Sequence, residues 1–289
     1  MQKQKVIVIL GQTATGKSDL AVRIAKKING EIISADSRQV YKNLDIGTGK
    51  ITKKEMGGVP HHLLDVASPK HKFTVSEYKK LAEEKIKEII SHEKTPIICG
   101  GTGLYIDAIT NGVIFPEVPP NNKLRKILEK KSEIELFKML QKLDSERSRT
   151  IDKNNKVRLI RAIEIAKALG KVPKITQAKS TYKFIKIGLF LPKDLLKKKV
   201  ELRVKKMFDK KNKGGLLNEI KKLKKTGISN KRLKEFGFEY FEPTYEKVVV
   251  ETLKYAKRQM TWFKRDKEIK WFDASKISDK EILDYLYIL

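Results

Sequence analysis

Five short runs of apolar residues along the 289-residue chain predict the strands of a parallel β-sheet. The runs lie at 5–10, 31–35, 96–100, 184–191 and 269–273. Stretches with helical apolar spacing separate the first three runs, notably 19–28 and 76–90, as βαβ units require. The pattern therefore predicts an α/β fold with a doubly wound parallel sheet.

The gap between the third and fourth runs is too long for one crossover helix, and it contains Pro116, Pro119 and Pro120. Helical patterns follow at 122–131, 133–144 and 154–169, the last closed by Gly170. We therefore expect an inserted all-helical domain at 117–183 and a core domain formed by 1–116 and 184–289. Basic helices, a long helix at 245–264 and a short one at 279–286 complete the predicted core.

The segment between the first predicted strand and the first predicted helix is a phosphate-binding loop. It matches the pattern G-x-x-x-x-G-K-S/T of P-loop NTPases and consists of Gly11, Gln12, Thr13, Ala14, Thr15, Gly16, Lys17 and Ser18. The glycines let the backbone curl, so that its N–H groups and the helix N-terminus converge on phosphate oxygens. Lys17 adds a positive charge and Ser18 a hydroxyl for Mg²⁺. The pattern does not say whose phosphate is bound.

Composition narrows the class of protein. Hydrophobic residues make up 40% of the chain, and no apolar stretch approaches the roughly 20 residues of a membrane helix. The first residues lead straight into a strand without room for a signal peptide, so we expect a cytoplasmic protein with no membrane partner. The single cysteine, Cys99, excludes an internal disulfide and a cysteine-based zinc site, and the four histidines lack zinc-ligand spacing.

The formal net charge of +29 predicts a polyanionic partner, with nucleic acid as the first candidate. The alternative explanation of this charge is a general bias toward lysine on every solvent-exposed face. Residues 193–234 carry 17 Lys and Arg against 4 Asp and Glu, in stretches that also show helical apolar spacing. We expect one basic face on these helices and one buried face, formed by Leu195, Leu202, Met207, Leu216, Ile220 and Leu223.

Two further strand ends carry reactive groups, and ligands of open α/β sheets bind at the carboxyl ends of the strands. Asp36 follows the second run. Its position allows three alternative roles: a general base, a Mg²⁺ ligand that acts through water, or a helix N-cap. Thr102 lies in a flexible glycine-rich turn after the third run. Taken by itself, a threonine at this place is most typical of a helix N-cap. Motor and switch ATPases carry a second motif, an apolar run that ends in Asp or Glu. This chain has no convincing separate run of that kind, unless 32–36 serves. The lack of such a run favours kinases and enzymes that hold a diphosphate.

Further segments occur in collinear order and point to one family. They are SADSRQVY at 34–41, DIGTGK at 45–50, GVPHHLLD at 58–65, GGTGLY at 100–105, VRLIRAIE at 157–164, RVKKM at 203–207 and KRQMTWF at 257–263. Together with the phosphate loop they span nearly the whole chain, and several are specific to that family. The chain resembles the bacterial tRNA dimethylallyltransferases, also called tRNA isopentenyltransferases.

The resemblance implies transfer of a dimethylallyl group from dimethylallyl diphosphate to N6 of the adenosine immediately 3′ of the anticodon in tRNA. Residues 11–18 would grip the diphosphate leaving group, with Mg²⁺ near Ser18 and with Arg203 reaching the same diphosphate. Asp36 would accept the N6 proton, with Thr102 as a further residue of the catalytic centre. The chemistry agrees, because N6 is a weak nucleophile that needs a base, and cations stabilise a departing diphosphate.

The same resemblance implies two sets of RNA contacts. The first set, at the target adenosine and its neighbours, comprises Asp36, Ser37, Arg38, Gln39 and Thr102. The second comprises Val157, Arg158, Leu159, Ile160 and Arg161. The target adenine must leave the anticodon loop to enter a closed pocket, while the basic helices and the insertion hold the stem-loop through phosphates and shape. We expect a monomer that prefers tRNAs with an A-rich stretch around the target.

Two positions depart from the family's pattern. Gln12 stands where proline is common, which predicts a looser loop with a polar side chain near its mouth, and Gly49 stands where alanine is usual. The basic tail is short, and the zinc finger of eukaryotic relatives is absent, as a single cysteine requires. The tRNA subset, further modification of the product and any step for His61 and His62 stay open.

Three alternatives use the same residues. A P-loop kinase of a nucleoside or small metabolite could set Asp36 against a hydroxyl, with lid arginines between 147 and 161. A free-AMP isopentenyltransferase would need neither the insertion nor the charge. A non-enzymatic RNA-binding module could use Trp262 and Phe263 among basic residues, although core packing at a helix end is the more typical role of such aromatics.

Overall fold

The computed structural model describes residues 3–174, 176–177 and 180–288, and the chain divides into two compact units. The first, the core unit, comprises Met1–Gly112 and Lys179–Leu289, and the second, the inserted unit, comprises Val113–Ala178. Residues 175, 178 and 179 of the predicted insertion lie outside the described residues, as do 1, 2 and 289 of the predicted core.

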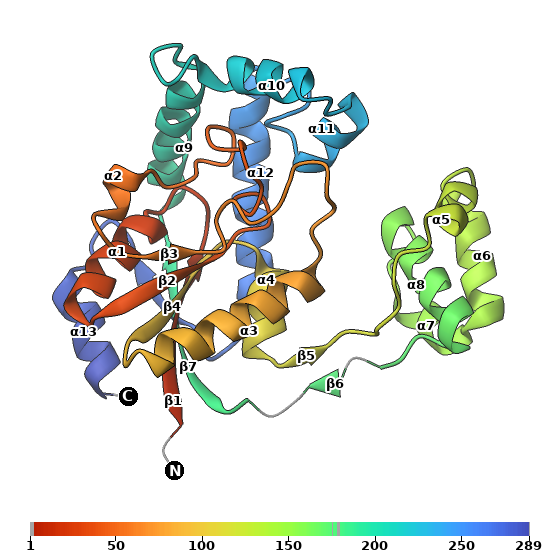
Figure 1. Ribbon diagram of the computed structural model, residues 1–289, viewed down its shortest axis with the longest axis horizontal. Helices are drawn as coiled ribbons and strands as arrows, with labels where there is room; N and C mark the ends of the chain where they lie inside the picture. Colours follow the sequence, from red (N-terminus) through yellow and green to blue (C-terminus); the bar gives the residue numbers. More distant parts are fainter. Residues whose placement is uncertain (1–2, 175, 178–179, 289) are drawn as a thin grey trace. The chain divides into compact units, whose positions relative to one another are not determined.

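The core unit is built on a six-stranded sheet in the order β3-β2-β4-β1-β7-β8 (Figure 1), in which every pairing is parallel. Its strands are β1 (Gln4–Gly11), β2 (Gly30–Ala35), β3 (His61–His62), β4 (Thr95–Gly100), β7 (Tyr182–Phe190) and β8 (Lys270–Asp273). The predicted doubly wound parallel sheet is therefore confirmed. The short edge strand β3 was not predicted, because two residues show no periodicity.

β1 lies at the centre of the sheet and supplies side chains to both faces. Ile7 pairs with Ile97 of β4 and with Ile185 of β7. Ile7 and Ile9 enter the smaller apolar cluster on one face, whereas Val6, Val8 and Leu10 enter the larger cluster on the other. Successive side chains of a strand point to opposite faces, so a strand covered on both sides is a continuous apolar run.

Helices cover both faces of this sheet. On the side of the smaller cluster, α1 (Lys17–Lys27) contacts α13 (Asp279–Ile288) (Figure 1). The larger cluster receives side chains from α3 (Val75–Ser91), α4 (Gly103–Thr110), α9 (Lys193–Phe208), α10 (Gly215–Lys225), α11 (Asn230–Phe236) and α12 (Tyr245–Phe263). The short α2 (Lys53–Met56) begins at a capping box of Thr52 and Glu55. None of the described helices combines the length and apolar character that a membrane crossing requires.

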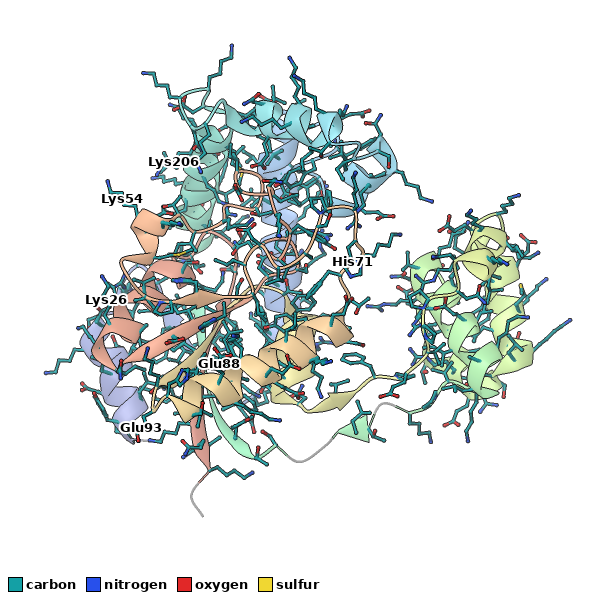
Figure 2. The ribbon with its side chains drawn as sticks, in the orientation of Figure 1. Lys26, Lys54, His71, Glu88, Glu93 and Lys206 are labelled. Carbon is teal, nitrogen blue, oxygen red and sulfur yellow. The ribbon has the colours of Figure 1, made fainter. Side chains whose placement is uncertain are left out.

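The prediction for the buried face of the basic helices is only partly right. Met207, Leu216, Ile220 and Leu223 are buried, but Leu195 and Leu202 are 40% and 57% exposed. α9 instead buries the row Leu196, Val200, Val204 and Met207, which shares only Met207 with the predicted residues. Each position turns a helix by about 100°, so the step from Leu195 to Leu196 leads from an exposed side of the helix to a buried one. Lysines such as Lys206 extend from the helix into solvent (Figure 2).

The inserted unit is a small helical bundle with its own core. It contains β5 (Val113–Ile114), α5 (Asn122–Leu128), α6 (Glu133–Leu143), α7 (Ser145–Thr150), α8 (Lys156–Leu169) and β6 (Thr176–Gln177). The two short strands pair antiparallel. Leu128, Leu136, Leu140, Leu159 and Ile163 form the fully buried part of the core. α8 ends at Gly170, which has a φ of 80°.

Candidate functional site

The phosphate loop turns sharply after β1 and leads directly into α1. Gly11 has a φ of 131°, and a Cβ at this position would lie 2.1 Å from the carbonyl oxygen of Leu189, so only glycine fits. Gly16, with a φ of 82°, occupies the N-cap position of α1, and no side chain caps the helix there. The N–H groups of the first turn and the positive end of the helix dipole are therefore available to an anion.

Gln12 anchors this loop, which corrects the prediction of a polar side chain at its mouth. The residue is only 9% exposed, and its Oε1 accepts a hydrogen bond from the N–H of Leu191 at 3.3 Å. Its carbonyl oxygen accepts from the Thr15 hydroxyl at 2.8 Å and from Lys17 Nζ. The side chain that replaces proline thus ties the loop to the end of β7.

A second anchor comes from α12. Gln259 is 5% exposed, and its Oε1 accepts from the Thr13 N–H at 2.7 Å while its Nε2 donates to the carbonyl of Gly101 at 2.9 Å. One side chain therefore joins the phosphate loop to the turn after β4. Sequence reasoning missed this role, and the only signal for it was the place of Gln259 in the segment 257–263.

Asp36 follows β2 and caps a turn. Its Oδ1 accepts from the N–H of Arg38 at 2.8 Å and from the N–H of Gln39 at 3.2 Å. Residues 37–40 form a turn and no helix begins there, so the helix N-cap alternative for Asp36 is wrong. The carboxylate keeps its second oxygen, Oδ2, for other partners.

Thr102 connects the ends of β2 and β4. It stands at the N-cap position of α4, but its side chain makes no capping hydrogen bond. Its Oγ1 instead accepts from the N–H of Ser37 at 3.0 Å. A capping role for Thr102 is therefore wrong. The predicted flexible turn is also shorter than expected, since α4 already begins at Gly103.

Arg203 reaches the phosphate loop from α9. Its Nη2 donates to the carbonyl of Thr48 at 2.8 Å, and its Nη1 donates to the Thr13 hydroxyl at 3.3 Å. Gly49 has a φ of 57°, and a Cβ there would lie 2.5 Å from Nη2, so glycine leaves room for the guanidinium. The core unit thus brings together the phosphate loop, Asp36 and Arg203, which are far apart in the sequence.

Burial shifts the pKa of two charged groups at this site. Burial lowers the pKa of Lys17 to about 8, with Arg203 acting in the same direction and with Cys99 and Asp36 opposing it. Burial also raises the pKa of Glu239 to about 7, against the charges of Arg203 and Arg38. Because Lys17 is desolvated and the nearby charge of Arg203 repels it, a bound anion would stabilise both charges. Sequence reasoning gave no signal for Glu239.

Cys99 is 7% exposed, and burial raises the pKa of its thiol to about 12, which agrees with an unreactive apolar role. Among the described residues, no group of three His, Cys, Asp or Glu side chains could hold a metal ion. Mg²⁺ commonly keeps several waters and binds substrate phosphates with one or two protein groups. Ser18 follows Lys17 in the chain and the Asp36 carboxylate acts on the charge of Lys17, so the hydroxyl and the carboxylate fit an ion that binds together with a diphosphate.

The second predicted set of RNA contacts lies on α8 of the inserted unit. Val157 is 77% exposed and Arg158 is exposed, whereas Leu159 and Ile160 belong to the buried core. Arg161 is half-buried and donates to Glu164 and to the carbonyl of Val118. Contacts from the side chains of Leu159 and Ile160 are therefore excluded, because no RNA can reach them.

The contacts of His62 and of the aromatic pair Trp262 and Phe263 indicate structural roles for these residues. His62 Nε2 and Lys94 Nζ each lie 2.6 Å from the carboxylate of Glu31 at the edge of the sheet. Trp262 Nε1 donates to Asp107 Oδ2 at 2.9 Å. Phe263 is only 2% exposed. These contacts favour packing over a surface that stacks RNA bases.

Comparison with known proteins agrees with this fold. A family model described as IPP transferase matches residues 39–266. The tRNA dimethylallyltransferase of Anoxybacillus flavithermus is 39% identical, over 94% of this chain and 91% of that protein. The full-length tRNA isopentenylpyrophosphate transferase from Bacillus halodurans superimposes with a TM-score of 0.70 at 34% identity, covering 99% of this chain and 95% of that chain. A eukaryotic dimethylallyltransferase acting on tRNA superimposes with a TM-score of 0.77 at 26% identity, covering 94% and 74%. The chain therefore belongs to the IPP transferase family, the tRNA dimethylallyltransferases.

Proposed function

We propose that the chain transfers the dimethylallyl group of dimethylallyl diphosphate to N6 of the adenosine 3′-adjacent to the anticodon in tRNA. The observation that carries this proposal is the convergence of the phosphate loop, Asp36 and Arg203 in the core unit. A loop and a separate arginine suit the departure of a diphosphate, and a carboxylate beside them suits removal of a proton. Family membership supplies the class of substrate.

In the proposed reaction, the bond between C1 of the dimethylallyl group and the diphosphate oxygen breaks, and a bond from C1 to N6 forms. The N–H groups at the start of α1, with Lys17 and Arg203, stabilise the charge of the leaving diphosphate. The Asp36 carboxylate accepts the proton from N6, while the hydrogen bonds of its Oδ1 hold its orientation. Mg²⁺ bound near Ser18 would supply further positive charge to the diphosphate.

We assign RNA recognition to both units. Ser37, Arg38 and Gln39 form the turn beside Asp36, where they contact the target adenosine and its neighbours, and Thr102 holds this turn in place. Exposed lysines of α9 and α10 and the exposed Arg158 bind phosphates. Every group in this proposal comes from one chain, so the proposed active form is a monomer.

The test is incubation of the purified chain with Mg²⁺, labelled dimethylallyl diphosphate and an anticodon stem-loop that carries an A-rich stretch. The RNA is then digested and analysed by mass spectrometry. We expect N6-dimethylallyladenosine whose formation depends on Lys17 and Asp36. Parallel reactions contain free AMP, or ATP with nucleosides. Prenylation of AMP in place of RNA, or consumption of ATP without RNA, would contradict the proposal.

A further inference from the structure

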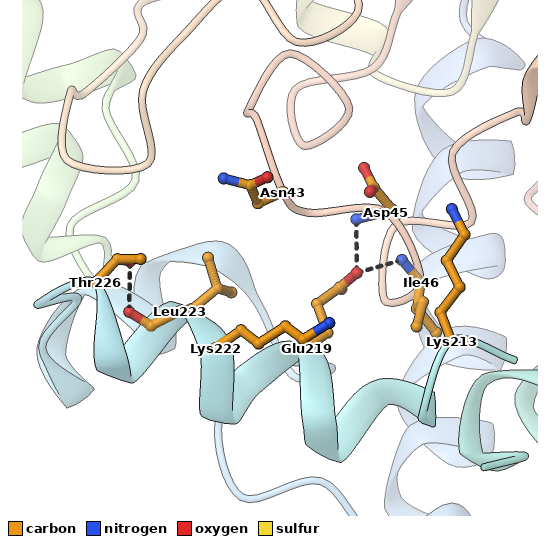
Figure 3. Close-up of a pocket in the computed structure, with 8 residues that line it drawn as sticks. All are labelled: Asn43, Asp45, Ile46, Lys213, Glu219, Lys222, Leu223 and Thr226. Atoms are coloured by element: carbon orange, nitrogen blue, oxygen red, sulfur yellow. Dashed lines mark hydrogen bonds between the residues drawn. The ribbon is translucent and has the colours of Figure 1, made fainter.

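A pocket of about 300 Å³ separates α10 from the loop at 43–46 (Figure 3). Its lining includes Glu219, which projects from α10 toward this loop and is only 8% exposed. The Oε2 of Glu219 accepts hydrogen bonds from the N–H of Asp45 at 2.9 Å and from the N–H of Ile46 at 2.7 Å. Its Oε1 accepts from the N–H of Gly47 at 3.1 Å. One carboxylate thus binds three consecutive backbone N–H groups.

A fourth donor fixes the carboxylate itself. The hydroxyl of Tyr240 donates to Oε1 of Glu219 at 2.8 Å. The ring of this tyrosine also lies against Gly47, where a Cβ would be 2.6 Å from the ring. Hydrogen bonds to an ionised acceptor are about twice as strong as bonds between neutral groups. The backbone at 45–47 is therefore held from two sides.

The loop continues from this anchor directly to Arg203. Thr48 is the next residue, and its carbonyl accepts the 2.8 Å hydrogen bond from Arg203 Nη2. Its hydroxyl donates back to the carbonyl of Leu44 at 2.6 Å, which closes the loop on itself. Gly49 then leaves the space that the guanidinium fills. The position of the Thr48 carbonyl is thus set by the N–H groups that Glu219 binds.

We propose that Glu219 is a positioning residue for Arg203, which it orients through the backbone of the loop at 45–48. This inference rests on the proposed function, in which Arg203 stabilises the diphosphate. Without the carboxylate, three N–H groups lose their acceptor and the Thr48 carbonyl moves. The charge of Arg203 is then still present but is displaced from the leaving group, where position decides how much it contributes.

The test compares Glu219→Gln with a matched control. The variant should lower kcat/KM for dimethylallyl diphosphate by roughly 10- to 100-fold, as a displacement of about 1 Å costs in other enzymes, with the Kd for the anticodon stem-loop unchanged. Glu31→Gln serves as the control, because Glu31 is also a buried carboxylate but bonds His62 and Lys94 at the edge of the sheet. It should lower the melting temperature and leave kcat/KM unchanged.

A double-mutant cycle with Arg203→Ala separates positioning from general damage. If Glu219 acts through Arg203, Glu219→Gln has no further effect on kcat/KM in the Arg203→Ala background. Two independent, multiplied losses would overturn this inference and leave the proposed function intact. An Arg203→Ala variant with wild-type kcat/KM would instead contradict the role of Arg203 in the proposed function.

Tyr240→Phe provides a second route to the same answer if Glu219→Gln does not fold. It removes the hydroxyl that donates to Glu219 Oε1 at 2.8 Å and keeps both the ring and the carboxylate. We expect a loss of kcat/KM that also disappears in the Arg203→Ala background. A loss that persists in this background would show that the loop does not act through Arg203.

Discussion

The turns after β2 and β4 in the core unit and the helix α8 of the inserted unit both match segments typical of the family. Their residues nevertheless differ in how many of them can face a ligand. At the carboxyl ends of β2 and β4, Asp36 accepts from the N–H groups of Arg38 and Gln39, and Thr102 accepts from the N–H of Ser37. On α8, Val157 is 77% exposed and Leu159 is fully buried. Residues in a tight turn can all face one site, whereas a helix rotates successive side chains by about 100°. Roles carried over from relatives therefore fit turns position by position, but on helices they fit only the exposed positions.

The two regions also differ in what holds them. The turns at the carboxyl ends of the core strands depend on side chains that bind backbone groups. One example is Gln259 of α12, which accepts from the N–H of Thr13 in the phosphate loop. The inserted unit depends on a leucine-rich core and on Glu164, whose side chain is 1% exposed and forms ion pairs with Arg125 and Arg161. Substitution of Arg161 would thus remove one of the two cations that pair with this buried carboxylate, and it would disturb folding together with any contact to RNA.

The largest effect in this comparison is expected from Asp36→Asn. Asparagine keeps an oxygen that accepts from the N–H groups of Arg38 and Gln39, but it has no basic oxygen for the N6 proton. The single-turnover rate of transfer should fall about 10²- to 10⁴-fold, with the melting temperature unchanged. Asp36→Ala, which removes both hydrogen bonds to the turn, serves as the reference for a loss of stability. If Asp36→Asn melted at the same low temperature as Asp36→Ala and retained transfer, Asp36 would serve only the turn.

The next largest effect separates two neighbours on α8. Leu159→Ala removes a fully buried side chain and should cost about 2–5 kcal/mol of unfolding free energy, whereas the exposed Val157→Ala should stay within about 0.5 kcal/mol. Urea unfolding followed by circular dichroism measures both. The two tryptophans, Trp262 and Trp271, lie in the core unit, so their fluorescence should report an unchanged core. Equal losses for the two variants would contradict the assigned faces of α8.

A smaller effect follows from the buried lysine of the phosphate loop. Lys17, with a pKa of about 8, carries its charge below that pH and loses it as the pH rises. Above pH 8, kcat/KM for dimethylallyl diphosphate should therefore decline by about tenfold per pH unit. Lys17→Arg keeps its charge in this range, so its lower activity should not show this decline. Persistence of the decline in Lys17→Arg would assign the titration to another group.

The smallest effect concerns the exposed surface of the inserted unit. Arg158→Ala should weaken binding of the stem-loop modestly and reduce the slope of log K against log salt by about one, because one phosphate contact is lost. Lys138→Ala, an exposed cation on α6 of the same unit, is the control and should leave the slope unchanged. Identical slopes for the two variants would remove Arg158 from the proposed interface.

Sequence reasoning predicted what depends on local pattern. The long strands and most helices follow from apolar periodicity, and the phosphate loop follows from a local motif. The pair His61 and His62 was too short to show a strand, and α9 buries Leu196 where the prediction placed Leu195. Gln259 and Glu219 bind loops 246 and about 170 residues away in the chain, and no pattern near either residue announces such partners.

The bond from Gln259 to the phosphate loop has a consequence for synthesis on the ribosome. The loop is made almost first, yet the side chain that fixes its backbone follows 246 residues later. β7, which pairs with β1 and anchors Gln12, also follows the entire inserted unit. A nascent chain halted before α12 would therefore carry every residue of the phosphate loop without its final shape. The order of translation would thus delay the proposed binding of diphosphate until the chain is nearly complete.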